Sequence, residues 1–141
     1  MKCKTLEKYM STNPHSIGQD QTLHAATLMM DKFKIRHLPV LDAGKVVGLI
    51  SDRDIKFALS FTGVNLEEMK VSDMAKEDAY VVSPSSKLDE VVAYMASRKL
   101  GSAIVMDNGK LVGIFTAVDA LGALSEILHE RQHTGCSSHS C

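Results

Sequence analysis

The sequence carries one eight-residue pattern twice, at residues 47–54 and again at residues 112–119. Each copy is an apolar stretch that contains a glycine, followed by a hydroxyl residue and, three positions later, an aspartate. The copies lie 65 residues apart, and the match continues without a gap from about residue 22 to residue 60. Self-similarity at a long fixed period indicates a tandem duplication, so the fold of this chain must contain one unit twice.

The composition limits the classes of function. A chain of 141 residues, 45% of them hydrophobic, is long enough for one domain with a core. Its 16 basic and 17 acidic side chains nearly balance, and it has no Trp, so we expect no nucleic-acid partner. No apolar run approaches the roughly 20 residues that cross a bilayer, so we expect no membrane partner.

The ends of the chain indicate its compartment. The first residues lack the apolar core of a signal peptide. The three cysteines lie near the ends, at positions 3, 136 and 141, and their number and placement do not predict a disulfide framework. We therefore expect a reducing, cytoplasmic environment.

Hydrophobic periodicity predicts the same elements in both repeats. Apolar residues at helical spacing follow Asp20, and they follow a capping pattern formed by Ser86 and Asp89. Turns at residues 42–44 and 107–109 predict hairpins, and Asn-Gly in the second turn is a strong hairpin signal. The remaining expected elements are short strands near residues 16–17 and 80–82, helices at 52–60 and 117–125, and a helical turn at 65–69.

These elements predict an α+β fold of two β-α-β-β-α repeats. A repeat of about sixty residues has little surface with which to close a core alone, so we expect the two to pack as one pseudo-two-fold module. The predicted boundaries are 8–60 for the first repeat, 61–71 for a linker, 72–126 for the second repeat, and 127–141 for a polar tail with cysteine and histidine.

The repeated motif has a structural and a functional interpretation. Ser51 with Asp54, and Thr116 with Asp119, have the spacing of a helix capping box, which requires no ligand. Alternatively, a glycine lets a ligand approach the backbone, and a hydroxyl at a helix N-terminus suits a phosphate. A carboxylate nearby can accept hydrogen bonds from a ribose diol. The functional interpretation therefore predicts a nucleoside phosphate at a strand–helix junction.

The motif, the element order and the Asp-x-Gly-Lys hairpins together resemble a stand-alone pair of CBS domains, also called a Bateman module, over about residues 8 to 126. The resemblance implies a regulatory protein that binds AMP, ADP, ATP or S-adenosylmethionine between its repeats. It implies phosphate contacts from Ser51 and Thr116, ribose contacts from Asp54 and Asp119, and a border near residues 13–17 and 80–82. The full set of candidate binding residues is Asn13, His15, Ile17, His37, Pro39, Gly48, Ser51, Arg53, Asp54, Tyr80, Val82, Gly113, Thr116 and Asp119.

The two repeats differ in charge around the motif. Repeat one has Arg36, His37 and Arg53 where repeat two has Gly101, Ser102 and Val118. These basic residues either form a solvated surface or contact a phosphate. The second alternative predicts that the Asp54 site binds phosphorylated ligands more tightly than the Asp119 site.

Other functions have weaker support in the sequence. No nucleophile motif or phosphate-binding Gly-rich loop is present, so we expect no catalysis. The alternative is a metal- or redox-responsive adaptor that uses the tail residues His129, His133, Cys136, His139 and Cys141, although their spacing matches no standard zinc finger. Apolar helix positions, namely Met29, Ala58, Ala123 and Ile127, predict a homodimer. The regulated protein partner stays unidentified.

Overall fold

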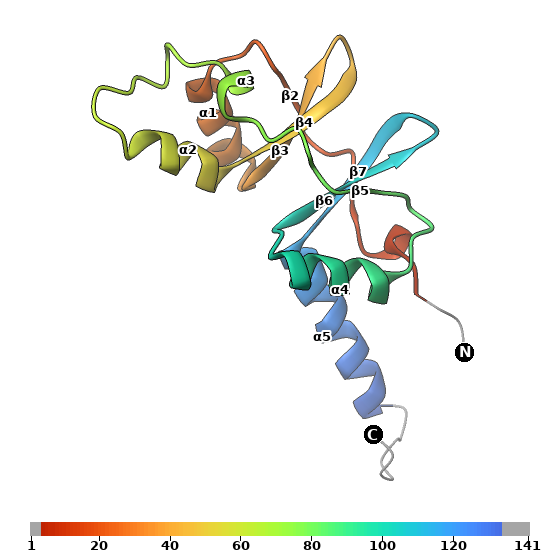
Figure 1. Ribbon diagram of the computed structural model, residues 1–141. Helices are drawn as coiled ribbons and strands as arrows, with labels where there is room; N and C mark the ends of the chain where they lie inside the picture. The colour runs from red at the N-terminus through yellow and green to blue at the C-terminus, as the bar shows by residue number, and fades with distance from the viewer. Residues whose placement is uncertain (1–3, 134–141) are drawn as a thin grey trace.

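The computed structural model describes residues 4–133, in which each repeat forms a small sheet with helices packed against it (Figure 1). The first sheet has the order β2-β3-β4, with β2 parallel to β3 and β3 antiparallel to β4. The first unit contains β2 (Ile17–Gly18), α1 (Leu23–Phe33), β3 (His37–Asp42), β4 (Lys45–Ser51) and α2 (Asp52–Leu59). A short helix, α3 (Val71–Met74), follows on the connection to the second unit.

The second unit repeats this arrangement with one additional strand. Its elements are β5 (Val81–Val82), α4 (Leu88–Arg98), β6 (Ser102–Asp107), β7 (Lys110–Thr116) and α5 (Ala117–His133). Two N-terminal elements, the 3-10 helix η1 (Leu6–Lys8) and β1 (Ser11–Thr12), join it and give the sheet order β1-β7-β6-β5. The predicted α+β class and the order of elements in each repeat are therefore confirmed.

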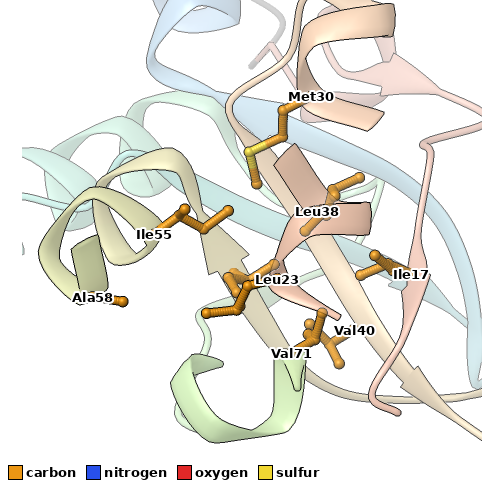
Figure 2. Close-up of a cluster of buried hydrophobic side chains, with 10 residues drawn as sticks. Ile17, Leu23, Met30, Leu38, Val40, Ile55, Ala58 and Val71 are labelled. Carbon is orange, nitrogen blue, oxygen red and sulfur yellow. The ribbon is translucent and has the colours of Figure 1, made fainter. Parts of the chain in front are cut away.

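The segment that leads into each repeat packs on the other repeat. Leu6 is fully buried in the core of the second unit, and Val71 is fully buried in the core of the first (Figure 2). Their main chains make matching contacts: Leu6 N–H donates to the Ser86 carbonyl at 3.1 Å, and Val71 N–H donates to the Gln21 carbonyl at 2.7 Å. Val71 is the equivalent of Leu6 at the 65-residue offset, and Ser86 is the equivalent of Gln21. The pseudo-two-fold relation between the repeats therefore includes the segments that they exchange.

The exchanged segments also complete the sheet edges. Ser11 pairs with Ile114 in β7, and its equivalent Lys76 forms an isolated bridge to Leu49 in β4. The chain therefore crosses between the sheets twice, once through residues 13–16 and once through residues 77–80 (Figure 1). These two crossovers connect the repeats at the centre of the molecule.

Close packing of the main chain accounts for the glycine of each motif. A Cβ added at Gly48 would lie 2.6 Å from the Lys76 carbonyl oxygen, and one added at Gly113 would lie 2.8 Å from the Ser11 carbonyl oxygen. Real Cβ atoms essentially never come so close to main-chain atoms. The expectation that these glycines leave room for a ligand is therefore corrected, because the exchanged strand occupies that room.

The hairpins agree with the turn signals in the sequence. Ala43 and Gly44 have φ angles of 51° and 83°, and Asn108 and Gly109 have 51° and 77°. Two successive positive φ values are typical of the type I′ turn that joins tight hairpins. The equivalent helices α1 and α4 each end at a lysine whose backbone is in the left-handed conformation, Lys34 and Lys99 respectively.

Several local predictions were wrong. Thr22, rather than Asp20, caps α1, because its hydroxyl accepts from Ala25 N–H. Ser86 does not cap α4, since its hydroxyl accepts instead from Ser83 N–H in the preceding turn. The turn expected at residues 65–69 is present, with Glu68 N–H donating to the Asn65 carbonyl at 3.0 Å, but the short helix α3 that follows it was not predicted. The last helix continues through His129 to His133 within the segment that was expected to be a tail.

Candidate functional site

The first motif forms the junction between β4 and α2. Asp54 accepts a hydrogen bond from Ser51 N–H at 2.9 Å and another from the Ser51 hydroxyl at 2.9 Å, while Asp54 N–H donates to Ser51 Oγ at 3.2 Å. This is a complete capping box, so the structural interpretation is confirmed at this position. The other carboxylate oxygen of Asp54 lies 3.5 Å from Lys76 Nζ, on the exchanged strand.

The second motif repeats the geometry with one difference. Asp119 accepts from Thr116 N–H at 2.9 Å and from its hydroxyl at 3.2 Å, and Asp119 N–H donates to Thr116 Oγ1 at 3.3 Å. Here the exchanged strand contributes a hydroxyl, because Ser11 Oγ lies 3.2 Å and 3.3 Å from the two oxygens of Asp119. Ser11 and Lys76 were absent from the predicted site, although the 65-residue offset relates them.

The predicted border residues lie on or beside the two crossovers. Asn13 has a positive φ of 51°, and His15 stacks on Phe33 with ring centroids 3.6 Å apart. The equivalent of His15 is Tyr80, which stacks on Tyr94 at 4.2 Å. Burial, followed by the neighbouring Tyr94 and Glu90, raises the pKa of Tyr80.

Two other predicted residues serve the cores, because Ile17 is buried in the first core and Val82 packs against the second. Pro39 is also buried, but it alternates in β3 with the core residues Leu38 and Val40 and so lies on the opposite face of the strand, together with His37.

The basic cluster surrounds the start of α2. Arg36 and Arg53 are exposed and form no ion pair within the described residues 4–133. His37 is directly opposite Ser51 in the antiparallel pair, so its side chain shares the face on which α2 begins. A Cβ added at Gly101 would lie 2.8 Å from His37 Nε2, so this imidazole also touches the second repeat.

Burial of the imidazole lowers the pKa of His37, and Arg36 lowers it further, whereas Asp54 and Asp52 oppose the shift. A base with a lowered pKa binds fewer protons when folded than when unfolded, so stability rises with pH through the window below about 6.5. We expect wild type to lose more stability than a His37→Asn variant when the pH falls through this window. Urea unfolding at several pH values measures the difference, and parallel curves for the two proteins would contradict it.

A separate cavity lies between α4 and α5. It has a volume of about 740 Å³ and an almost entirely apolar lining that includes Leu88, Val92, Met95, Leu121 and Leu124. Its apolar character makes it unsuited to a phosphate, and it belongs to the helical face of the second unit rather than to the crossovers.

Comparison with known proteins identifies the family. The family model for the CBS domain matches residues 6–60 and again residues 71–126. The chain belongs to the CBS domain family. Its two CBS repeats are the two units of the fold, and the resemblance recognised in the sequence is confirmed.

Solved structures share the fold of this CBS pair. A protein from Vibrio cholerae that is described as an acetoin utilization protein (AcuB) is 30% identical in sequence. Its TM-score is 0.81, and the match covers 94% of this chain and 98% of that one. CBSX2, solved in complex with AMP, is 25% identical, with a TM-score of 0.78 over 87% of this chain and 97% of that one.

Inosine-5′-monophosphate dehydrogenase from Staphylococcus epidermidis is a relative in sequence, 27% identical over 84% of this chain. The CBS pair spans about a quarter of the length of that enzyme, 24%.

The described helices and side chains bear on the predictions about membrane and metal. No helix within residues 4–133 combines the length and hydropathy required to cross a membrane. The described part of the chain contains no group of three or more His, Cys, Asp or Glu residues that could hold a metal ion. Cys136, His139 and Cys141 lie outside the described residues, so the tail hypothesis stays untested.

Proposed function

We propose that this CBS pair is a non-catalytic regulatory module that binds an adenine nucleotide at the junction of β4 and α2. The observation that carries the proposal is the charge around Asp54. A buried carboxylate lies there beside Lys76, the cations Arg36 and Arg53 are near the same helix start, and the His37 imidazole lies opposite Ser51. The AMP complex of CBSX2, a structural relative, supports an adenosine phosphate as the ligand class.

The residues have distinct roles in this proposal. One oxygen of Asp54 completes the helix cap, and the other faces Lys76 and is available to ribose hydroxyls. The helix dipole at the N-terminus of α2 favours a phosphate beside the Ser51 hydroxyl, while Asp52 N–H and Asp54 N–H already donate to the Arg36 carbonyl and to Ser51 Oγ. Arg53 adds a guanidinium that has no competing ion pair in the described structure.

Ligand binding at Asp54 also gives a route for a signal. The Lys76 side chain is 67% exposed and its pair with Asp54 spans 3.5 Å, so it contributes well below about 1 kcal/mol and ribose can displace it. The main chain of Lys76 is bonded to Leu49, and the following residues cross to β5 in the second unit. A nucleotide that prefers one position of this crossover would change the arrangement of the repeats, which a partner protein in the cytoplasm could recognise.

A comparison of ATP with adenosine tests the phosphate contacts. Arg53→Ala should weaken binding of ATP and AMP by about ten- to a hundredfold, the usual value of a charge-assisted hydrogen bond. Adenosine should lose little affinity, since it has no phosphate. Arg98→Ala removes an arginine from α4, where it lies over Tyr94, and is the matched control. Calorimetric titration measures all three ligands, and an Arg53→Ala protein with unchanged ATP affinity would contradict the assignment.

We also propose a homodimer, with a corrected interface. Ala58 and Ala123 are 2% and 3% exposed and belong to the two cores, and Met29 and Ile127 pack against them. The exposed apolar stripe on α5 consists of Val118, Leu121, Leu124 and Leu128, exposed by 50% or more, and it adjoins the apolar cavity. A second copy is the commonest partner for such a stripe.

Leu121→Glu should convert the dimer to a monomer, because it places a charge within the apolar stripe of α5. Val47→Glu adds the same charge to the first hairpin and is the control. Light scattering at tens of micromolar distinguishes the two states. Wild-type protein with the mass of one chain would overturn the dimer.

A further inference from the structure

The two motifs lie in different electrostatic surroundings although their main chains match. The cations near Asp54 have uncharged equivalents near Asp119, 65 residues away. The pairs are Arg36 with Gly101, Arg53 with Val118, Lys56 with Leu121, and Lys76 with Ser11, while His37 corresponds to Ser102. Within residues 4–133, Asp119 forms no ion pair, and its partners are hydroxyls and a main-chain amide.

The second site nevertheless has a polar group without a partner. Ser102 is 4% exposed, and its hydroxyl has no hydrogen-bond partner in the described structure. It is directly opposite Thr116, the residue before α5, so both side chains project from the same face of the sheet. A buried hydroxyl without a partner is costly, and a ligand at the start of this 17-residue helix would satisfy it.

The side chains that contact Asp119 are uncharged hydroxyls. His37 touches Gly101 from the first repeat, and burial lowers the pKa of this imidazole, which disfavours its charged form. Ser11 reaches Asp119 from the exchanged strand, and Val118 exposes an apolar side chain on α5. A phosphate would therefore meet the Asp119 carboxylate without equivalents of Arg53 and Lys76, and the partial charge of the helix terminus would offset less of the repulsion.

We propose that the Thr116–Asp119 site binds an adenosyl ligand that has no phosphate, while the Asp54 site takes the nucleotide. The proposal rests on the proposed function in that both sites hold ribose through an aspartate. A neutral nucleoside avoids the repulsion at Asp119, and a sulfonium such as that of S-adenosylmethionine is attracted by it. The module then responds to two chemically different adenosyl ligands at once.

Competition experiments separate the two sites. S-adenosylmethionine and adenosine should each bind to protein already saturated with ATP. Asp119→Ala should lower this second binding at least about tenfold and leave ATP affinity unchanged, and Asp54→Ala should do the reverse. Ser102→Ala keeps the helix cap and should weaken only the second site, by a few-fold, without loss of stability.

A gain-of-function variant tests the charge argument directly. Ser11 and Val118 are exposed, so the double change Ser11→Lys with Val118→Arg places two cations at the second site without disturbing a core. It should raise the number of ATP molecules bound per chain from one to two. The proposal is overturned if wild type binds ATP equally at both sites, or if all ligands compete for one Asp54-dependent site. Failure of every adenosyl compound to bind would instead overturn the proposed function as well.

Discussion

Replacing Gly48 with alanine should destabilise the protein by about 3 kcal/mol, and Gly113→Ala should act in the same way. The new Cβ of residue 48 would lie 2.6 Å from the Lys76 carbonyl oxygen and 3.3 Å from its carbon. Both are main-chain atoms, so the exchanged strand must move away. That movement breaks the two hydrogen bonds between Leu49 and Lys76, at 3.0 Å and 2.9 Å.

Gly122→Ala is the matched control, because nothing lies within 4 Å of the added Cβ and the residue is inside α5. Alanine there should stabilise the protein by about 0.5–1 kcal/mol, as in any helix interior. Thermal unfolding should show a decrease of about 10 °C for Gly48→Ala and a small increase for the control. Equal melting temperatures for Gly48→Ala and wild type would mean that the strand exchange is not tightly packed.

Asp54→Ala should abolish high-affinity nucleotide binding, with a loss of about a hundredfold or more. The carboxylate can accept two hydrogen bonds from the ribose, and bonds to a charged group contribute about 1.5–3 kcal/mol each. The variant also loses the helix cap, which contributes about 1 kcal/mol to stability. Both effects are expected together, so a control must separate them.

Asp73→Ala provides that control. Asp73 accepts from Lys70 N–H at 2.9 Å at the start of α3, which is the same type of cap at a helix outside the proposed site. The Asp73→Ala change should lower the free energy of unfolding by an amount similar to the loss of the Asp54 cap, and it should leave nucleotide affinity unchanged. Calorimetry on both variants measures the affinity, and urea unfolding measures the cost of the cap. Nucleotide affinity that falls equally in both variants would show that Asp54 acts only through stability.

The local part of the fold could be predicted because its signals lie close together in the sequence. The two hairpins are specified by residues that readily adopt positive φ angles, Gly44 in the first turn and Asn108 with Gly109 in the second. Apolar spacing predicted α1 and α4, and the motif predicted the start of α2 and α5. The capping boxes at Ser51 and Thr116 follow from residues three positions apart.

The exchange of segments could not be predicted in this way, because it depends on contacts between distant residues. Leu6 packs with Leu88 and Val91, and no local pattern indicates which repeat receives it. For the same reason, Lys76 and Ser11 were not recognised as neighbours of the two aspartates. The glycines of the motif were correctly recognised as positions of close approach, but the sequence does not state whether a ligand or the chain itself approaches.

The apolar pattern of a short helix also leaves its orientation open. Ala58 and Ala123 were expected at a surface and face the cores, while Leu121 and Leu124 are on the exposed side of α5. Small residues allow a helix to approach the sheet closely, and the larger ones next to them then remain outside. The interface residues of the proposed dimer follow from this orientation and not from hydrophobicity alone.

Calorimetric titration of the wild-type protein with AMP, ADP, ATP, S-adenosylmethionine and Zn²⁺ tests the central claim most directly. We expect at least one adenosine phosphate to bind with near-micromolar affinity, about −8 kcal/mol. At a hundredfold excess over Kd that ligand should stabilise the fold by about 2.7 kcal/mol, which thermal unfolding will show as an increase of several degrees. The absence of both heat and thermal shift for every adenosyl ligand, or a response to Zn²⁺ alone, would contradict the account.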